Sequence, residues 1–329
     1  MTTGVVIGKF LPPHSGHRHL IEVAAAAVDH LDVIVCAHES QPIEGATRVA
    51  WLREIHPDVS VHLTPDDIPE DQAERTSQAW AARTVEVLGH APDVVFTSEE
   101  YGPRYARYLG AEHVSVDPAR TRFPVSGTAV RADPASQWSF LEPCVRAWFL
   151  KRICVVGAES TGTSTLAEAL AQDYGAACVP EFGRAFCEER LEAGEPLDWK
   201  TDDFIEIARR QQADEDAAAR TCGPVLVCDT DALATAIWHE RYLRTRSPEV
   251  EALAAARRYS LYVLTSDDIP FVQDGTRDGE HIRSWMTNRF REELTRRPEP
   301  WIEVKGSPQH RLAAAVHAID ALAPSVESG

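Results

Sequence analysis

Short β-branched runs alternate along the chain with longer stretches whose apolar positions recur at helical spacing. In the first 116 residues, the runs predict strands at 3–8, 32–37, 59–64, 93–97 and 113–116. The stretches between them predict helices at 16–31, at 47–55, and around Trp80, Val85 and Leu88. Strands that alternate with helices in this way indicate a parallel sheet with helices on both faces.

The same alternation begins again at residue 151. Strands are expected at 151–157, 224–229, 260–265 and 301–305. Helices are expected at 164–174, 183–193 and 203–220, around Trp285 and Phe290, and at the end of the chain, with a loop over 274–281. We therefore predict an α/β protein of two domains, 1–145 and 146–329, joined where Pro134 and Pro143 separate the two patterns.

Composition narrows the classes of partner. The 329 residues are 44% hydrophobic and 26% charged, which excludes a disordered chain. The formal net charge of -18 argues against non-specific binding of nucleic acid, which depends on cationic side chains. The sequence shows neither an apolar run long enough to span a membrane nor a secretory leader. Seven scattered cysteines without a Cys-x-x-Cys pair predict reduced thiols in a cytoplasmic protein.

The turn after the first predicted strand carries the first chemical signal. Residues 8–20 read GKFLPPHSGHRHL and lead into a helix, whose N-terminus favours an anion. Gly16 lets a phosphate approach the backbone, and His14 and His17, three residues apart, can both face it. The alternative is a pair of capping or surface histidines, but the position of the whole pattern favours a phosphate site.

A second polar turn follows late in the first predicted domain, where the sequence reads PVSGTAVRADP. Ser126 and Thr128 offer hydroxyl groups, and Arg131 offers a two-pronged donor for phosphate. Taken singly, the hydroxyl residues would be helix caps and the arginine a surface residue. Their order after the histidine motif favours a shared phosphate site.

Residues 157–165, GAESTGTST, form the second chemical signal. They lie between a predicted strand and a predicted helix, and Gly157 and Gly162 have the spacing of a phosphate-binding loop. Ser164 can bind Mg²⁺, but Thr163 stands at the position of the usual lysine. Loss of one preorganised donor commonly lowers a rate by roughly 10²–10³. Nucleotide binding through the backbone amides should therefore survive better than phosphoryl transfer.

Polar residues further along the second half suggest a kinase-like site. Asp229 and Asp231 lie at a strand end, where one can hold Mg²⁺ or activate a hydroxyl group, although a capping role would also explain either. A predicted helix begins at the Glu-Phe-Gly-Arg sequence 181–184. Arg277, in the 274–281 loop, is either a phosphate contact in a lid or a solvated loop charge.

At its first motif the chain resembles the nucleotidyltransferase superfamily that carries an HxGH signature. With the P-loop and the E-[FY]-G-R, D-T-D and D-G-x-R elements, nearly the whole chain resembles the NadR-type bifunctional family. This resemblance implies a Rossmann-like nucleotidyltransferase domain fused to a P-loop kinase-like domain. The first would join nicotinamide mononucleotide to AMP from ATP, giving NAD, and the second would phosphorylate nicotinamide riboside with ATP and Mg²⁺. The helix-turn-helix repressor domain of some members has no counterpart in the sequence, so no such role is expected.

The resemblance also implies roles for single residues. The residues expected to be catalytic are His14, His17, Arg131 and Asp229, with His17 nearest the transition state. Those expected at ATP phosphates are Gly8, Lys9, Phe10, Gly16, Ser126 and Thr128 in the first domain, and Gly157, Ser160, Gly162, Thr163, Ser164, Thr165 and Arg277 in the second. Substrate contacts are expected from Trp80, Glu181, Arg184 and Asp231, and Mg²⁺ ligands from Ser164 and Asp229. Trp80 would lie against the nicotinamide ring, or else in the core.

Three functions therefore compete. One is a bifunctional enzyme whose kinase is weak, or is rescued by Arg184 or Arg277. Another is a monofunctional adenylyltransferase whose C-terminal half senses a nucleotide or riboside, and the third is a non-catalytic interaction protein. The set of His14, His17 and Arg131 argues against the third. The sequence leaves open the choice between nicotinamide and nicotinate substrates, and whether the chain forms a homo-oligomer.

Overall fold

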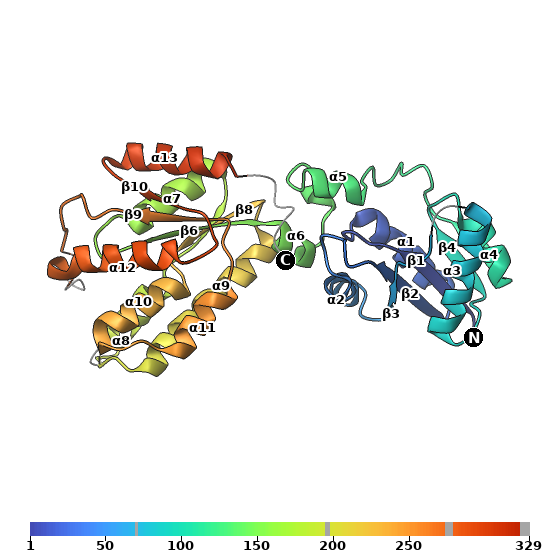
Figure 1. Ribbon diagram of the computed structural model, residues 1–329, viewed down its shortest axis with the longest axis horizontal. Helices are drawn as coiled ribbons and strands as arrows, with labels where there is room; N and C mark the ends of the chain where they lie inside the picture. Colours follow the sequence, from blue (N-terminus) through green and yellow to red (C-terminus); the bar gives the residue numbers. More distant parts are fainter. Residues whose placement is uncertain (70–71, 195–197, 274–278, 323–329) are drawn as a thin grey trace. The chain divides into compact units, whose positions relative to one another are not determined.

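The computed structural model describes residues 1–69, 72–194, 198–273 and 279–322 and consists of two compact units (Figure 1). The first ends at Phe149 and the second begins at Leu150. A boundary after residue 145 would cut helix α6 (Pro143–Phe149). This helix stays with the first unit because its Cys144, Val145 and Phe149 are buried in one cluster with Ile43 and Trp51.

The first unit is built on a parallel sheet of five strands in the order β3-β2-β1-β4-β5. The strands are β1 (Thr3–Gly8), β2 (His30–Ala37), β3 (Ser60–Pro65), β4 (Val94–Thr97) and β5 (Glu112–Ser115). The helices are α1 (Ser15–Ala27), α2 (Gly45–Ile55), α3 (Ala73–Leu88), α4 (Gly102–Leu109), α5 (Gly127–Ala132) and α6, with a 3₁₀ turn η1 (Trp138–Phe140). The helix predicted over 16–31 ends earlier because β2 already begins at His30.

Alternate side chains of the first sheet enter two separate cores, as strand geometry requires. Val6 of β1 is buried in a cluster with residues of α1 and α2. Its neighbours Val5 and Ile7 are buried in another cluster with residues of α3 and α4. The sheet is thus covered on both faces, and β1, paired with β2 and β4, lies at its centre.

The second unit has its own parallel sheet, in the order β10-β9-β6-β8-β7. Its strands are β6 (Lys151–Gly157), β7 (Ala177–Val179), β8 (Val225–Asp229), β9 (Leu261–Thr265) and β10 (Trp301–Val304). Its helices are α7 (Thr163–Tyr174), α8 (Phe182–Glu192), α9 (Thr201–Thr221), α10 (Ala232–Leu243), α11 (Pro248–Ala256), α12 (Arg283–Thr295) and α13 (Pro308–Asp320), with a 3₁₀ turn η2 (Glu280–Ile282). Residues 274–278 of the predicted loop lie outside the described residues.

The faces of the second sheet are covered by different helices. Buried residues of α7 and α13 pack with Ile153, Val155 and Val263 in one cluster. Helices α9 and α12 contact the sheet as well, and α10 packs against both of them (Figure 1). The alternating pattern therefore predicted the class of both units correctly: two α/β folds with parallel sheets.

All seven cysteines are free, as the sequence analysis expected. Cys154 and Cys228 lie opposite each other on β6 and β8 and are fully buried. Burial raises the pKa of the Cys36 thiol to about 12 and that of Cys178 to about 11. Among the described residues, the model contains no helix with the length and apolar character needed to cross a membrane.

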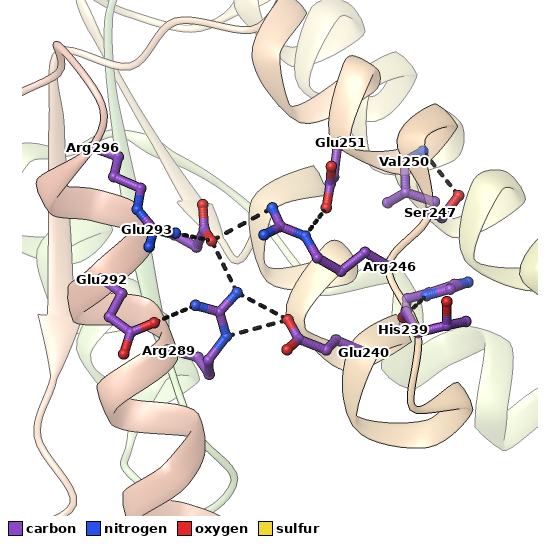
Figure 2. A network of polar contacts seen from close by, with 11 residues as sticks. His239, Glu240, Arg246, Ser247, Val250, Glu251, Arg289, Glu292, Glu293 and Arg296 are labelled. Atoms are coloured by element: carbon purple, nitrogen blue, oxygen red, sulfur yellow. Dashed lines mark hydrogen bonds and ion pairs between the residues drawn. The ribbon is translucent and has the colours of Figure 1, made fainter.

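An ion-pair network joins three helices of the second unit (Figure 2). Arg289 of α12 donates to Glu240 of α10 and to Glu292 and Glu293 of its own helix, with Nη2–Oε distances of 2.9 Å to Glu240 and Glu293. Arg246, in the turn before α11, lies between Glu251 and Glu293. Because the Arg289 side chain is only 12% exposed, this network should contribute more to stability than a surface pair.

We expect Arg289→Gln to lower the free energy of unfolding by about 2–3 kcal/mol, because Glu240 and Glu293 would lose their shared cation in a partly buried setting. Urea unfolding followed by circular dichroism measures the change. Arg209→Gln is the control, since Arg209 and Glu249 form an exposed pair worth at most about 1 kcal/mol. Equal effects of the two substitutions would contradict this view of the network.

Candidate active sites

The first unit contains a cavity of about 620 Å³ at the carboxyl ends of its strands. Gly8 ends β1, Thr97 ends β4, and Val116 and Asp117 follow β5; all four line the cavity. Ligands of open parallel sheets bind at this edge, where the chain changes direction across the sheet. Lys9, Phe10, Gly16 and Ser126, also predicted from the sequence, lie in the lining.

His14 and His17 meet in this cavity as predicted from their spacing. Their rings stack with centroids 3.8 Å apart and an interplanar angle of 26°. The edge of Phe10 packs against His17, with ring centroids 5.0 Å apart. His14 is the N-cap residue of α1, so both imidazoles lie at a helix N-terminus. The Nδ1 atoms of both rings are buried without a hydrogen-bond partner.

Both imidazoles are neutral at neutral pH. Burial, reinforced by the charge of Arg120, lowers the pKa of His14 to about 4. The pKa of His17 is well below its usual value because of burial, with further contributions from His14 and Arg120. A neutral imidazole can donate one hydrogen bond to a phosphate oxygen without the cost of a buried charge.

The polar turn 124–134 contacts one side of the loop that joins β1 to α1, residues 9–14, which we call the histidine loop. Ser126 caps α5 by accepting a hydrogen bond from the amide of Ala129 at 3.1 Å. Arg131 donates to the carbonyl oxygen of Leu11 and, at 3.4 Å, to the hydroxyl of Thr128. Neither Thr128 nor Arg131 belongs to the cavity lining. The structure therefore shows Arg131 bracing the loop, and its predicted phosphate contact stays a prediction.

Two arginines that sequence reasoning did not select line the first cavity. They are Arg104 of α4, whose Nε is buried without a partner, and Arg120, which donates to Glu99 at 2.8 Å. Lys9 also lines it and forms a 3.2 Å ion pair with Asp66. Trp80 of α3 lies in the lining and is half-buried. No local motif marks Arg104 or Arg120, because the fold brings them in from distant parts of the chain.

A buried arginine also holds the loop after β1. Arg48 of α2 is fully buried and donates through Nη1 to the carbonyl oxygens of Lys9, at 2.5 Å, and Cys36, at 3.1 Å. Gly127 comes so close to the loop that a Cβ there would lie 2.4 Å from the Leu11 oxygen. The histidine loop is therefore fixed through the carbonyl oxygens of Lys9 and Leu11, while His14 and His17 line the cavity.

The second unit contains a cavity of about 190 Å³ at the start of α7. The predicted loop residues Gly157, Ser160, Gly162, Thr163, Ser164 and Thr165 all line it. Ser160 and Gly162 have positive φ angles of 56° and 82°, which turn the loop into the helix. At Gly157 a Cβ would lie 2.2 Å from the hydroxyl oxygen of Thr265, so the close packing of the loop on β9 requires glycine there.

Asp229 lies at the end of β8 beside this loop. It accepts hydrogen bonds from the hydroxyl groups of Ser164 and Thr163, and Arg184 adds a favourable charge. Burial nevertheless raises the pKa of the carboxyl above its usual value. Its Oδ1 atom is buried without a hydrogen-bond partner. The structure thus brings together Ser164 and Asp229, the two residues predicted to bind Mg²⁺.

Asp231 has a different environment from its neighbour. It is 1% exposed, caps α10 by accepting from the Ala234 amide at 3.0 Å, and accepts from the Tyr262 hydroxyl at 2.7 Å. It does not line the cavity. The geometry shows the capping role, and the substrate contact predicted for Asp231 stays a prediction.

Aromatic side chains form the far wall of the second cavity, and sequence reasoning missed them. Trp199 and Tyr242 stack with centroids 5.1 Å apart, and Trp238 and Tyr242 with centroids 6.0 Å apart. Glu181 and Arg184, predicted as substrate contacts, also line this cavity. Arg277, the predicted phosphate contact of the lid, lies outside the described residues. The wall comes from α10 and the segment before α9, so no single motif reveals it.

These two sites and folds define a nucleotide-handling protein, and the comparisons agree. A model of the AAA domain family matches residues 152–311. The trifunctional NAD biosynthesis/regulator protein NadR of Escherichia coli K12 is 30% identical over 299 residues, which are 84% of this chain and 72% of that protein. The Salmonella typhimurium protein of the same name is 30% identical over 83% of this chain and 71% of its own length.

Solved structures show the same fold over the whole chain. A NadR protein in complex with NR has a TM-score of 0.76 at 20% identity, covering 98% of this chain and 96% of its own. A NadR protein in complex with NAD and AMP-PNP has a TM-score of 0.73 at 21% identity, with the same coverage. The chain belongs to the NadR family, whose members are NAD-biosynthesis proteins.

We expect Arg120→Gln to raise the pKa of His14 from about 4 while leaving it below 6.5, because the charge of Arg120 is removed and the burial remains. Long-range nitrogen–proton NMR spectra of the imidazole rings, recorded across a pH series, measure this. Arg122→Gln is the control, since Arg122 is exposed and is not among the groups that lower this pKa. A His14 pKa unchanged by Arg120→Gln would contradict the electrostatic account.

Proposed function

We propose that the first unit transfers the adenylyl group of ATP to nicotinamide mononucleotide and so forms NAD and pyrophosphate. The observation that carries this proposal is the stacked pair His14 and His17 at the N-terminus of α1, inside a cavity also lined by Arg104 and Arg120. An oxygen of the mononucleotide phosphate attacks the α-phosphorus of ATP, and the bond to the β-phosphate breaks. No group of the protein needs to become covalently attached.

The residues of the first cavity would act by position and charge. The neutral imidazole of His17 donates to the oxygens of the α-phosphate, whose charge changes in the transition state. Arg104, Arg120 and Lys9 supply positive charge for the phosphates in a protein whose net charge is -18. Trp80, half-buried in the lining, offers a flat apolar surface to the nicotinamide ring.

We propose further that the second unit phosphorylates nicotinamide riboside with ATP, which supplies the mononucleotide. The support is a loop with phosphate-binding geometry beside the buried Asp229, in a cavity lined also by Glu181, Arg184 and an aromatic wall suited to a flat base. The 5′-hydroxyl oxygen of the riboside attacks the γ-phosphorus, the bond to the β-phosphate breaks, and ADP leaves. Asp229, beside the loop, would either accept the proton of this hydroxyl group or hold Mg²⁺.

Ser164 and Asp229 fit a magnesium ion, since one buried carboxylate oxygen of Asp229 has no partner and both residues offer hard oxygen ligands. Among the described residues, no group of three or more His, Cys, Asp or Glu side chains could hold a metal by itself. This agrees with Mg²⁺, which usually takes one or two protein ligands together with phosphate oxygens. When bound, the ion would neutralise charge on the β- and γ-phosphates.

The alternative is that the second unit only senses a nucleotide or riboside. Incubation of the purified protein with nicotinamide riboside and ATP-Mg²⁺ separates the two functions. Formation of mononucleotide or NAD supports the kinase, and riboside binding without turnover supports the sensor. Because Thr163 replaces the lysine of the loop, a slow but measurable reaction is expected.

His17→Ala should lower NAD synthesis from the mononucleotide and ATP by roughly 10²–10³, the usual effect of removing one preorganised donor. Coupled detection of NAD measures the rate, and circular dichroism shows that the fold persists. His90→Ala serves as the control, because His90 is exposed and does not line the cavity. An unchanged rate in the His17 variant would show that the site is assigned wrongly.

Asp229→Asn should reduce riboside phosphorylation by about 10²-fold or more, since the amide can neither accept a proton readily nor bind Mg²⁺ as well. The same variant should leave NAD synthesis from added mononucleotide intact, because that reaction belongs to the other unit. Asp173→Asn is the control, because Asp173 of α7 is exposed and does not line the cavity. Equal loss of both activities in Asp229→Asn would indicate misfolding, which circular dichroism would reveal.

A further inference from the structure

Thr163 leaves the phosphate-binding loop of the second unit without its usual lysine, yet the loop is surrounded by buried arginines. Arg311 of α13 donates to the carbonyl oxygen of Thr161 at 2.5 Å, and Arg283, the first residue of α12, donates to that of Ser160 at 3.1 Å. Their side chains therefore hold two consecutive carbonyl oxygens of the loop. Each buried guanidinium needs a nearby anion, because a buried charge without a counter-ion is costly in free energy.

The described carboxylates balance every loop-side arginine except one. Glu159, within the loop, pairs with the nearly fully buried Arg241 at 2.8 Å. Arg311 pairs with Asp268 and donates to the Ser266 carbonyl oxygen at 3.0 Å. Arg283 makes no ion pair with a carboxylate in the part of the chain that the structure describes.

The environment of Arg283 points to an anion as its missing partner. The residue is 8% exposed, and its Nε is buried without a hydrogen-bond partner. Its Nη1 and Nη2 atoms donate to the neutral carbonyl oxygens of Ile269, at 3.0 Å, and Ser160. The guanidinium also lies 5.6 Å from the centre of the Phe271 ring. Ser160 itself lines the cavity, so this charge lies directly behind the cavity wall.

We infer that Arg283 is a positioning residue that supplies, from behind the loop, the positive charge that a lysine at position 163 would supply from within it. Arg283 holds the Ser160 carbonyl oxygen away from the cavity, and its charge lowers the energy of a di- or triphosphate at the start of α7. The inference rests on the proposed binding of ATP by the second unit.

A double-mutant cycle tests this inference. It compares four proteins: the wild type, Arg283→Gln, Thr163→Lys and the variant that carries both substitutions. Riboside phosphorylation is assayed with ATP-Mg²⁺, and mononucleotide and NAD are counted together because the first unit can convert one into the other. Arg283→Gln should raise the KM for ATP about tenfold, while kcat and the KM for nicotinamide riboside, which carries no phosphate, change less. The riboside therefore acts as an internal control.

Thr163→Lys decides between a charge role and a purely structural one. If Arg283 replaces the lysine, Thr163→Lys should restore the KM for ATP in the Arg283→Gln protein and should improve it less in the wild type. Equal effects of Thr163→Lys in both backgrounds would overturn the inference. So would an Arg283→Gln protein whose KM rises equally for ATP and riboside, since a distorted loop would affect both.

Arg296→Gln is the matched control, because Arg296 (Figure 2) is the C-cap residue of the same helix and its side chain is 61% exposed. It should leave the KM for ATP within about twofold of the wild-type value.

If the wild-type protein forms no product from riboside, the proposed kinase fails. The affinity of each of the four proteins for ADP-Mg²⁺ is then measured by calorimetric titration. The first unit is common to all four proteins, so any difference reports on the second. Additive or absent effects on ADP binding would again overturn the inference.

Discussion

Guanidinium groups that donate to main-chain carbonyl oxygens hold the candidate phosphate loops of both units. In the first unit Arg48 and Arg131 bind the carbonyl oxygens of Lys9 and Leu11. In the second, Arg283 and Arg311 bind those of Ser160 and Thr161. In a trans peptide unit the N–H points away from the C=O, so the contacts to Ser160 and Thr161 direct the following amides of Thr161 and Gly162 to the opposite side. The carbonyl of Leu11 precedes Pro12, which has no N–H, so Arg131 fixes only the shape of its loop. The same contacts cost little reorganisation when a ligand binds, because the loop is already in shape.

This arrangement explains how an acidic protein can handle phosphates. The net charge of -18 lies mostly on exposed side chains, and it repels anions at long range. Within the sites, low exposure weakens the screening by solvent, so a few fixed donors outweigh many distant carboxylates. In the first cavity the partly buried Arg104 is placed to do this, whereas Arg120, whose side chain is 47% exposed, and Arg184 of the second cavity are open to solvent.

Local spacing predicted the parts of each site that lie within one turn of chain. His14 and His17, three residues apart, meet because a helix begins at their position, and Gly157 and Gly162 follow the spacing of a known loop. Contributions from elsewhere could not be predicted. Trp238 lies on α10, a helix that is buried on most sides. Such a helix has no single apolar stripe, so the hydrophobic pattern of the sequence did not predict it. The contact of Arg131 with the carbonyl oxygen of Leu11 was not predicted either, because the sequence context does not show which oxygen a guanidinium reaches.

The buried thiols have a practical consequence for the study of this protein. A thiol reacts as its thiolate, and the raised pKa values of Cys36 and Cys178 leave almost none of that form at neutral pH. Cys154 and Cys228 are enclosed in the second unit and Cys144 in the first, whereas Cys36 also lines the first cavity and Cys178 is half-buried. Alkylation of the sulfur atoms of Cys144, Cys154 and Cys228 therefore requires the surrounding unit to open. Peptide-resolved labelling kinetics would give an opening rate for each unit within one intact chain, without any engineered probe.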